Sequence, residues 1–123
     1  MLDDPSRPAG QVATASGSGS SERREVPRYP FIASAEETDL ESGTRLTARV
    51  AELSRKGCYL DTLNPFPNGT RIRLIIFHSD ATFTTLAKVI YAQPNMGMGV
   101  AFTTIEPAQM DVLQKWLAEI GAG

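Results

Sequence analysis

Cysteine and histidine are almost missing from this sequence. Its 123 residues include one of each, Cys58 and His78, which excludes an internal disulfide and any zinc site built from several such ligands. Ser79 and Asp80 follow His78 directly, but side chains contiguous in sequence cannot form a catalytic triad, because triad members meet through the fold. No other nucleophile and base stand out, so we expect neither an enzyme nor a metal site. We expect Cys58 to be a small buried apolar residue.

Long apolar runs and an excess of positive charge are missing as well. No run approaches the ~20 apolar residues that span a bilayer, and the start, MLDDPSRPAG, lacks the basic and apolar regions of a secretory signal. Twelve basic and 14 acidic residues give a net charge of −2 and a pI of about 5.3, which argues against a general DNA- or RNA-binding protein. We therefore expect a cytoplasmic protein without a membrane or a nucleic-acid polymer as partner.

The first 21 residues contain few large apolar side chains and many glycines, serines and alanines. Such a segment cannot bury enough surface to offset the entropy that it loses on ordering. We expect a disordered tail over residues 1–21 and a single domain over residues 22–123, a length that can bury a modest core.

Beyond this tail, apolar and polar residues alternate. Leu46, Ala48 and Val50 alternate with polar residues, and a second such run covers residues 70–78, as is typical of half-buried strands. A slip in the alternation near Thr85–Leu86 indicates a β-bulge. Strands are expected at residues 30–37, 44–53, 57–62, 70–78, 82–92 and 98–104. The pattern predicts a mainly β fold, a small antiparallel barrel of six strands.

The last part of the sequence has helical spacing instead. Its apolar residues recur every three or four positions and form one stripe: Met110, Leu113, Trp116, Leu117 and Ile120. Pro107 suits the first turn of a helix, and Gly121 suits its end. We expect one C-terminal α-helix that packs against the barrel.

Between the tail and the first strand lies an arginine-rich arm, residues 22–28, within the stretch ERREVPRYPF. Pro27 and Pro30 forbid a regular helix, so Arg24 and Arg28 lie on an extended chain. The guanidinium group has a planar fork of donors that suits phosphate oxygens and the O6/N7 edge of guanine. The alternative is a solvated basic linker paired with Glu22 and Glu25.

A second polar stretch, ELSRKG, follows the strand at residues 44–53. Ser54 and Gly57 fall in a tight connection, where a hydroxyl and free backbone N–H groups can bind an anion. Glycine there allows either a positive φ or a close approach of the backbone. The alternative is an ordinary turn between two strands.

Taken together, the two stretches resemble the PilZ domain family, which carries R-x-x-x-R on an N-terminal arm and [D/N]-x-S-x-x-G on a barrel. Arg24 and Arg28 match the first motif, and Ser54 and Gly57 match the second. The GMGVAF stretch and the helix ending in LQKWL are also similar to the family, so the resemblance covers about residues 22–120. Glu52 departs from it, because it stands at the Asp/Asn position.

The resemblance implies a receptor for cyclic di-GMP, a bacterial second messenger, that signals to an as yet unidentified effector protein by a change of its arm. It implies that Arg24 and Arg28 grip phosphates and guanine edges, that Ser54 hydrogen-bonds the ligand, and that Gly57 lets the backbone approach. Glu52 would accept from guanine N–H groups, at about 1.5 Å greater reach than aspartate, one carbon–carbon bond. Arg23 would favour a stacked pair of ligand molecules. No cofactor is implied.

Two other functions remain open at this point. One is a PilZ-fold interaction module of pilus or motility machinery that binds no nucleotide, which the glutamate at position 52 favours. The other is an oligonucleotide-binding barrel, since exposed aromatic residues and arginines can stack on bases, although the acidic pI opposes it.

Overall fold

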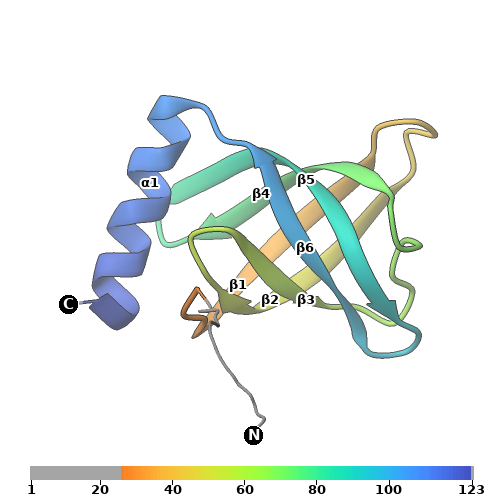
Figure 1. Cartoon of the computed structure of the whole chain (residues 1–123), viewed down its shortest axis with the longest axis horizontal. Coiled ribbons are helices and arrows are strands. Elements are labelled where there is room, and N and C mark those ends of the chain that lie inside the picture. Colours follow the sequence, from red (N-terminus) through yellow and green to blue (C-terminus); the bar gives the residue numbers. More distant parts are fainter. Residues whose placement is uncertain (1–25, 123) are drawn as a thin grey trace, which may run out of the picture.

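The computed structural model describes residues 26–122, so the expected tail (1–21) and the arginines Arg23 and Arg24 lie outside the described residues. Within this range the chain forms six strands and a C-terminal helix (Figure 1). The strands are β1 (Tyr29–Asp39), β2 (Arg45–Leu53), β3 (Gly57–Asp61), β4 (Arg71–His78), β5 (Ala81–Gln93) and β6 (Gly97–Thr104). The helix α1 (Pro107–Leu117) is followed by one π-helical turn, Ala118–Ala122.

The six strands close into an antiparallel barrel in the order β1-β2-β3-β6-β5-β4, so the expected barrel is confirmed. The barrel interior contains the alternating apolar residues of every strand. Ile72, Leu74 and Ile76 of β4 are fully buried, and Cys58 of β3 is buried as expected. Closure removes free sheet edges and gives a small domain a continuous core.

Two irregularities interrupt the pairing of β5 with β6. The register shifts between Leu86 and Ala87, close to the expected bulge, and again between Val89 and Tyr91. The second shift was not foreseen from the sequence. It lies where alternation breaks down, because Val89 is fully buried whereas both Ile90 and Tyr91 are exposed. The bulged strand thus presents two large side chains on the outside of the barrel.

Helix α1 lies across one end of the barrel, as Figure 1 shows. Its Leu113 and Trp116 are buried, and Trp116 lies 5.4 Å from Phe31 of β1, between ring centroids. His78 at the end of β4 packs against the same two rings, with centroids 4.4 Å from Phe31 in a tilted contact and 5.4 Å from Trp116 in an edge-on contact. The expected apolar stripe therefore packs the helix against β1, β4 and β5.

The expectation that Gly121 ends the helix was wrong. Gly121 lies inside the π-helical turn, and a Cβ on it would stand 2.3 Å from the ring of Tyr29. Tyr29, the first residue of β1, therefore covers Gly121 directly. The glycine is needed at this position for a close approach between the start of the barrel and the end of the helix, not for termination.

The barrel core also holds a carboxyl group. Glu37 of β1 is fully buried, opposite Leu46 of β2 and Leu74 of β4, and neither of its carboxyl oxygens has a hydrogen-bond partner among the described residues. Desolvation, with a smaller contribution from Glu36, raises the pKa of Glu37 to about 8. The side chain is therefore protonated and neutral at neutral pH.

Candidate functional site

A hollow of about 700 Å³, here called the arm groove, lies beside the described part of the arm. This volume is in the range of about 300–1,000 Å³ that is usual for small-molecule sites. Its walls come from the arm, the β2–β3 turn and the outer side of β3, β5 and β6. The lining residues are Val26, Arg28, Ser54, Lys56, Gly57, Cys58, Ile90, Tyr91, Gly99, Val100 and Ala101. Arg28, Ser54 and Gly57, three of the residues singled out in the sequence, thus meet in one place.

The register of β1 on β2 explains why Arg28 lies beside the turn that holds Ser54 and Gly57. Tyr29 pairs with Leu53 in an antiparallel ladder, and Arg28 and Ser54 are the next residues outward on each side. Residues that continue an antiparallel pair beyond its end remain neighbours. The pairing therefore carries Arg28 to the mouth of the β2–β3 turn, although 25 residues separate the two in sequence.

The Ser54 hydroxyl is fully occupied by its own turn. It accepts hydrogen bonds from the N–H groups of Lys56 (3.1 Å) and Gly57 (3.0 Å) and donates one to the Gly57 carbonyl (3.1 Å). A hydroxyl has one donor and two acceptor positions, so all three are used. Ser54 is 4% exposed and shapes the turn from the inside. Its described contacts make it a positioning residue for the groove wall.

Gly57 is required by the barrel itself. A Cβ at this position would stand 2.1 Å from the carbonyl oxygen of Val100 on β6. This oxygen belongs to the backbone of a paired strand and cannot move away. Of the two expectations for this glycine, the close backbone approach is the one found, and the approaching segment is β6. The turn is tied to the same strand by a hydrogen bond from Phe102 N–H to the Lys56 carbonyl, at 2.8 Å.

Glu52 is not part of the groove lining and contacts the arm instead. Its Oε1 lies 3.7 Å from Nε of Arg28, and both side chains are about half exposed, at 47% and 57%. Glu52 is also paired with Tyr59 of β3, beside an irregularity in the β2–β3 ladder. In this structure the carboxylate forms an exposed ion pair with Arg28, the one arginine among the described residues of the arm.

Sequence reasoning missed Lys56, Ile90 and Tyr91 as groove residues. The ring of Tyr91 covers Gly99, where a Cβ would stand 2.4 Å from it. The alternating glycines of β6 are the signal that could have revealed this aromatic wall, because they leave room for rings on a neighbouring strand. Tyr91 and Ile90 are 38% and 49% exposed, which gives the groove an apolar side opposite its cations.

The arm groove combines positive charge with an aromatic surface. Arg28 and Lys56 provide positive charge, and Tyr91 provides a surface on which an aromatic ring can stack. Cys58 is buried, and burial raises the pKa of its thiol, so it is no nucleophile. Among residues 26–122, no group of three or more His, Cys, Asp or Glu side chains is placed to hold a metal ion. Within the same range, no helix combines the length and the apolar character needed to cross a membrane.

Comparison with known proteins gives a consistent result. The family model described as the PilZ domain matches residues 22–119. The structure is similar to the PilZ domain of YcgR from Escherichia coli, solved with c-di-GMP, at a TM-score of 0.66 and 16% identity, over 82% of this chain and 93% of that one. A search of the curated proteins found no match.

Two longer solved structures are similar as well. The inhibitor of motility MotI from Bacillus subtilis matches at a TM-score of 0.64 and 17% identity, over 80% of this chain and 51% of MotI. A longer YcgR structure from Escherichia coli, in complex with c-di-GMP, matches at a TM-score of 0.65 and 18% identity, over 79% of this chain and 45% of that chain. The chain thus spans about half of these two proteins, and at such identities the likeness establishes the fold.

Proposed function

This chain belongs to the PilZ domain family, and on that premise we propose that it is a receptor for cyclic di-GMP, bound in the arm groove. The observation that carries the proposal is the meeting of Arg28, Ser54 and Gly57 at one hollow of about 700 Å³. Two related structures, both of YcgR, are described as containing c-di-GMP, which supports this choice of ligand.

In the proposed complex, the arm arginines and the apolar wall hold different parts of the ligand. Arg28, with Arg24 preceding it on the arm, binds phosphate oxygens and the O6/N7 edge of guanine. Lys56 adds a further cation at the groove wall. Tyr91 stacks on the face of a base, a contact that contributes about 1–3 kcal/mol per base. Ile90 adds an apolar contact beside it. Ser54 and Gly57 act through the turn that they shape.

Ligand binding changes the arm, and the arm carries the signal. Fixing a flexible residue costs about 1–2 kcal/mol, so closure requires several charge-assisted contacts of about 1.5–3 kcal/mol each. Closure of the arm changes the surface that the protein offers to an effector protein in the cytoplasm. In the proposed role the protein is a regulatory receptor and no enzyme.

Calorimetric titration with cyclic di-GMP tests the proposal. The wild-type chain binds with micromolar or lower Kd, and Arg24→Ala and Arg28→Ala each weaken binding at least tenfold. Arg71→Ala, an exposed arginine on β4 outside the groove, is the matched control and leaves binding unchanged. Two ligands per chain are expected if Arg23 supports a stacked pair, and a stoichiometry of one removes that role.

One observation favours a second candidate, an interaction module of pilus or motility machinery that binds no nucleotide. Glu52 stands where the family motif has Asp or Asn, and its carboxylate forms an ion pair with Arg28. A wild-type chain that gives no heat with cyclic di-GMP, together with an unchanged NMR spectrum, supports this second candidate and overturns the first.

A further inference from the structure

A second surface feature begins where the arm groove ends. Two adjoining hollows of about 470 and 490 Å³ lie between the β2–β3 turn and helix α1. We call them together the α1 groove. Its lining residues are Arg55, Lys56, Ala101, Phe102, Thr103, Ile105, Met110, Leu113, Gln114, Leu117 and Ala118. Lys56 lines the arm groove as well, so one side chain borders both.

One face of α1 forms the floor of this groove. Met110, Leu113, Gln114, Leu117 and Ala118 follow the spacing of a single helical stripe. Leu113 is buried against the barrel, but the other four keep part of their surface exposed. From Met110 to Ala118 the stripe measures about 12 Å at the usual rise per residue, which is about two helical turns.

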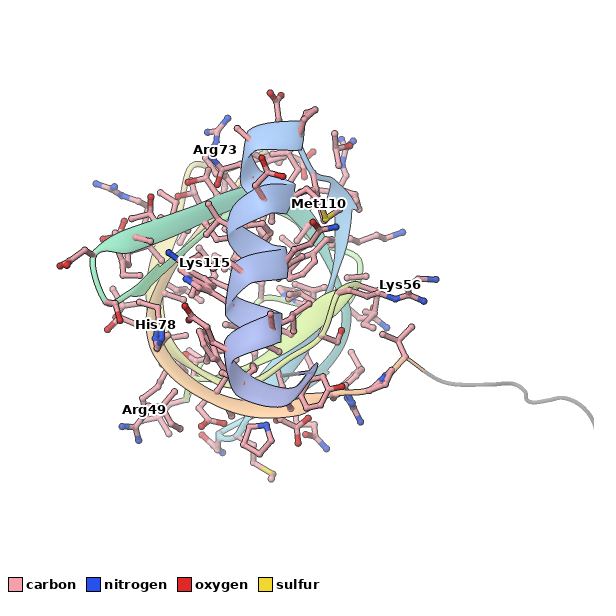
Figure 2. The ribbon with its side chains drawn as sticks, turned by 90° about the vertical axis from the view of Figure 1, so that its left-hand side faces the viewer. Arg49, Lys56, Arg73, His78, Met110 and Lys115 are labelled. Atoms are coloured by element: carbon pink, nitrogen blue, oxygen red, sulfur yellow. The ribbon has the colours of Figure 1, made fainter. Side chains whose placement is uncertain are left out.

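The rim of the α1 groove is positively charged. Arg55 and Lys56 are both exposed, and none of the lining residues, all within the described range, is acidic. Figure 2 shows Lys56 and Met110 on the same side of α1, whereas Lys115 and His78 lie on its other side. An apolar floor beside two cations is complementary to an apolar stripe flanked by carboxylates.

We propose that the α1 groove binds an acidic amphipathic helix of the effector protein. A helix that lays its apolar side chains into a groove is a common mode of peptide recognition, and the flexible side chain of Met110 adapts well to such a partner. The carboxylates beside the apolar stripe would pair with Arg55 and Lys56. The effector is the one that the proposed cyclic di-GMP receptor would signal to, so the inference rests on that function. Binding of the helix does not itself require nucleotide.

Because Lys56 borders both grooves, it determines whether nucleotide and helix strengthen or weaken each other's binding. The ammonium group of Lys56 reaches either the phosphates in the arm groove or a carboxylate in the α1 groove. Bound cyclic di-GMP also adds two negative charges next to the site of an acidic helix, and like charges repel. We therefore expect nucleotide and acidic helix to weaken each other's binding, by the same factor in both directions.

The test uses the whole chain and two synthetic 15-residue peptides. Both carry leucines at helical spacing, one flanked by glutamates and its twin by lysines. NMR titration without nucleotide is expected to show shifts at Met110, Gln114 and Leu117 with the acidic peptide, which binds at least tenfold more tightly than its twin. Equal affinity for both peptides, shifts elsewhere, or no shifts at millimolar peptide overturn the proposal.

Two variants and one addition complete the experiment. Gln114→Glu places a carboxylate in the groove and is expected to weaken binding of the acidic peptide at least fivefold. Asn64→Asp is the matched control, because it adds the same charge on an exposed loop outside the groove and is expected to have little effect on binding. Saturating cyclic di-GMP is expected to weaken binding of the acidic peptide at least threefold. An unchanged affinity for the peptide overturns the expected antagonism between nucleotide and helix. Calorimetry with nucleotide alone decides the receptor proposal separately, so the two failures are distinguishable.

Discussion

Arg28 of the arm and Glu52 of β2 form an exposed ion pair, with 3.7 Å between Nε and Oε1. Exposed pairs of this kind contribute about 0–1 kcal/mol. The pair therefore keeps Arg28 near the mouth of the arm groove without binding it tightly. An anionic ligand with two phosphates can replace Glu52 as the partner of Arg28.

This relationship predicts the effect of Glu52→Gln. Because the variant loses the carboxylate that competes for Arg28, we expect cyclic di-GMP to bind up to fivefold more tightly, which is about 1 kcal/mol. The gain is expected to shrink at high salt, since salt screens exposed charges. Calorimetry at two ionic strengths measures it. Weaker binding instead would mean that Glu52 contacts guanine directly, as the sequence alone suggested.

Ser54→Ala is expected to disturb the turn and, through it, the groove. Two backbone N–H groups, those of Lys56 and Gly57, lose their acceptor. An unsatisfied buried donor costs about 1–3 kcal/mol, so the free energy of unfolding falls by about that amount. Denaturant unfolding measures the loss, and the affinity for cyclic di-GMP falls with it. Unchanged stability with lost affinity would indicate a direct ligand contact instead.

Tyr91→Ala is expected to weaken cyclic di-GMP binding about 5- to 150-fold, the range that corresponds to about 1–3 kcal/mol of base stacking. Phe77→Ala is a matched control, because Phe77 has the same 38% exposure and lies on β4 outside the groove. Calorimetry on both variants is the measurement. Equal losses for the two would show that Tyr91 is not a base platform.

Glu37 predicts an unusual pH dependence of stability. Its pKa in the folded protein is about 8, above the 4.5 of an unperturbed glutamate, so the folded state holds the proton more tightly. The resulting stability is fully present below about pH 4.5 and is lost as the pH rises through 8. Relative to Glu37→Gln, whose amide does not titrate, the wild type is expected to lose roughly 3–4 kcal/mol between pH 5 and 8. Parallel stability curves for the two proteins would contradict this.

The sequence contained enough to predict the barrel, because period-two alternation and turn residues are local signals. It also contained both motifs of the site, and the proximity of Arg28 to Ser54 follows from a register that pairs Tyr29 with Leu53. Arg23 and Arg24 lie outside the described residues, so their roles stay predictions. The sequence pattern could not show which residues lie against these glycines. Val100 approaches Gly57 and Tyr29 covers Gly121, and both contacts join residues that are distant in sequence.

Two features escaped prediction for a common reason. The exposure of Tyr91 results from a register shift against β6, and a shift is a property of two strands and not of one. Glu37 occupies an inward position in the alternation of β1, although a glutamate is normally charged. Burial favours the neutral form of its carboxyl group and so raises its pKa. In both cases tertiary pairing overrides the preference of the single residue.

The most direct measurement is an NMR titration of the wild-type chain with cyclic di-GMP, read at every backbone amide. We expect the largest shifts at Arg28, in residues 54–58 and 99–101, and at Tyr91. A second hollow of the same volume, about 700 Å³ beside Leu46 and Leu63, serves as an internal control and is expected to stay unchanged. Shifts confined to that second hollow, or none at saturating ligand, would contradict the assignment of the arm groove as the nucleotide site.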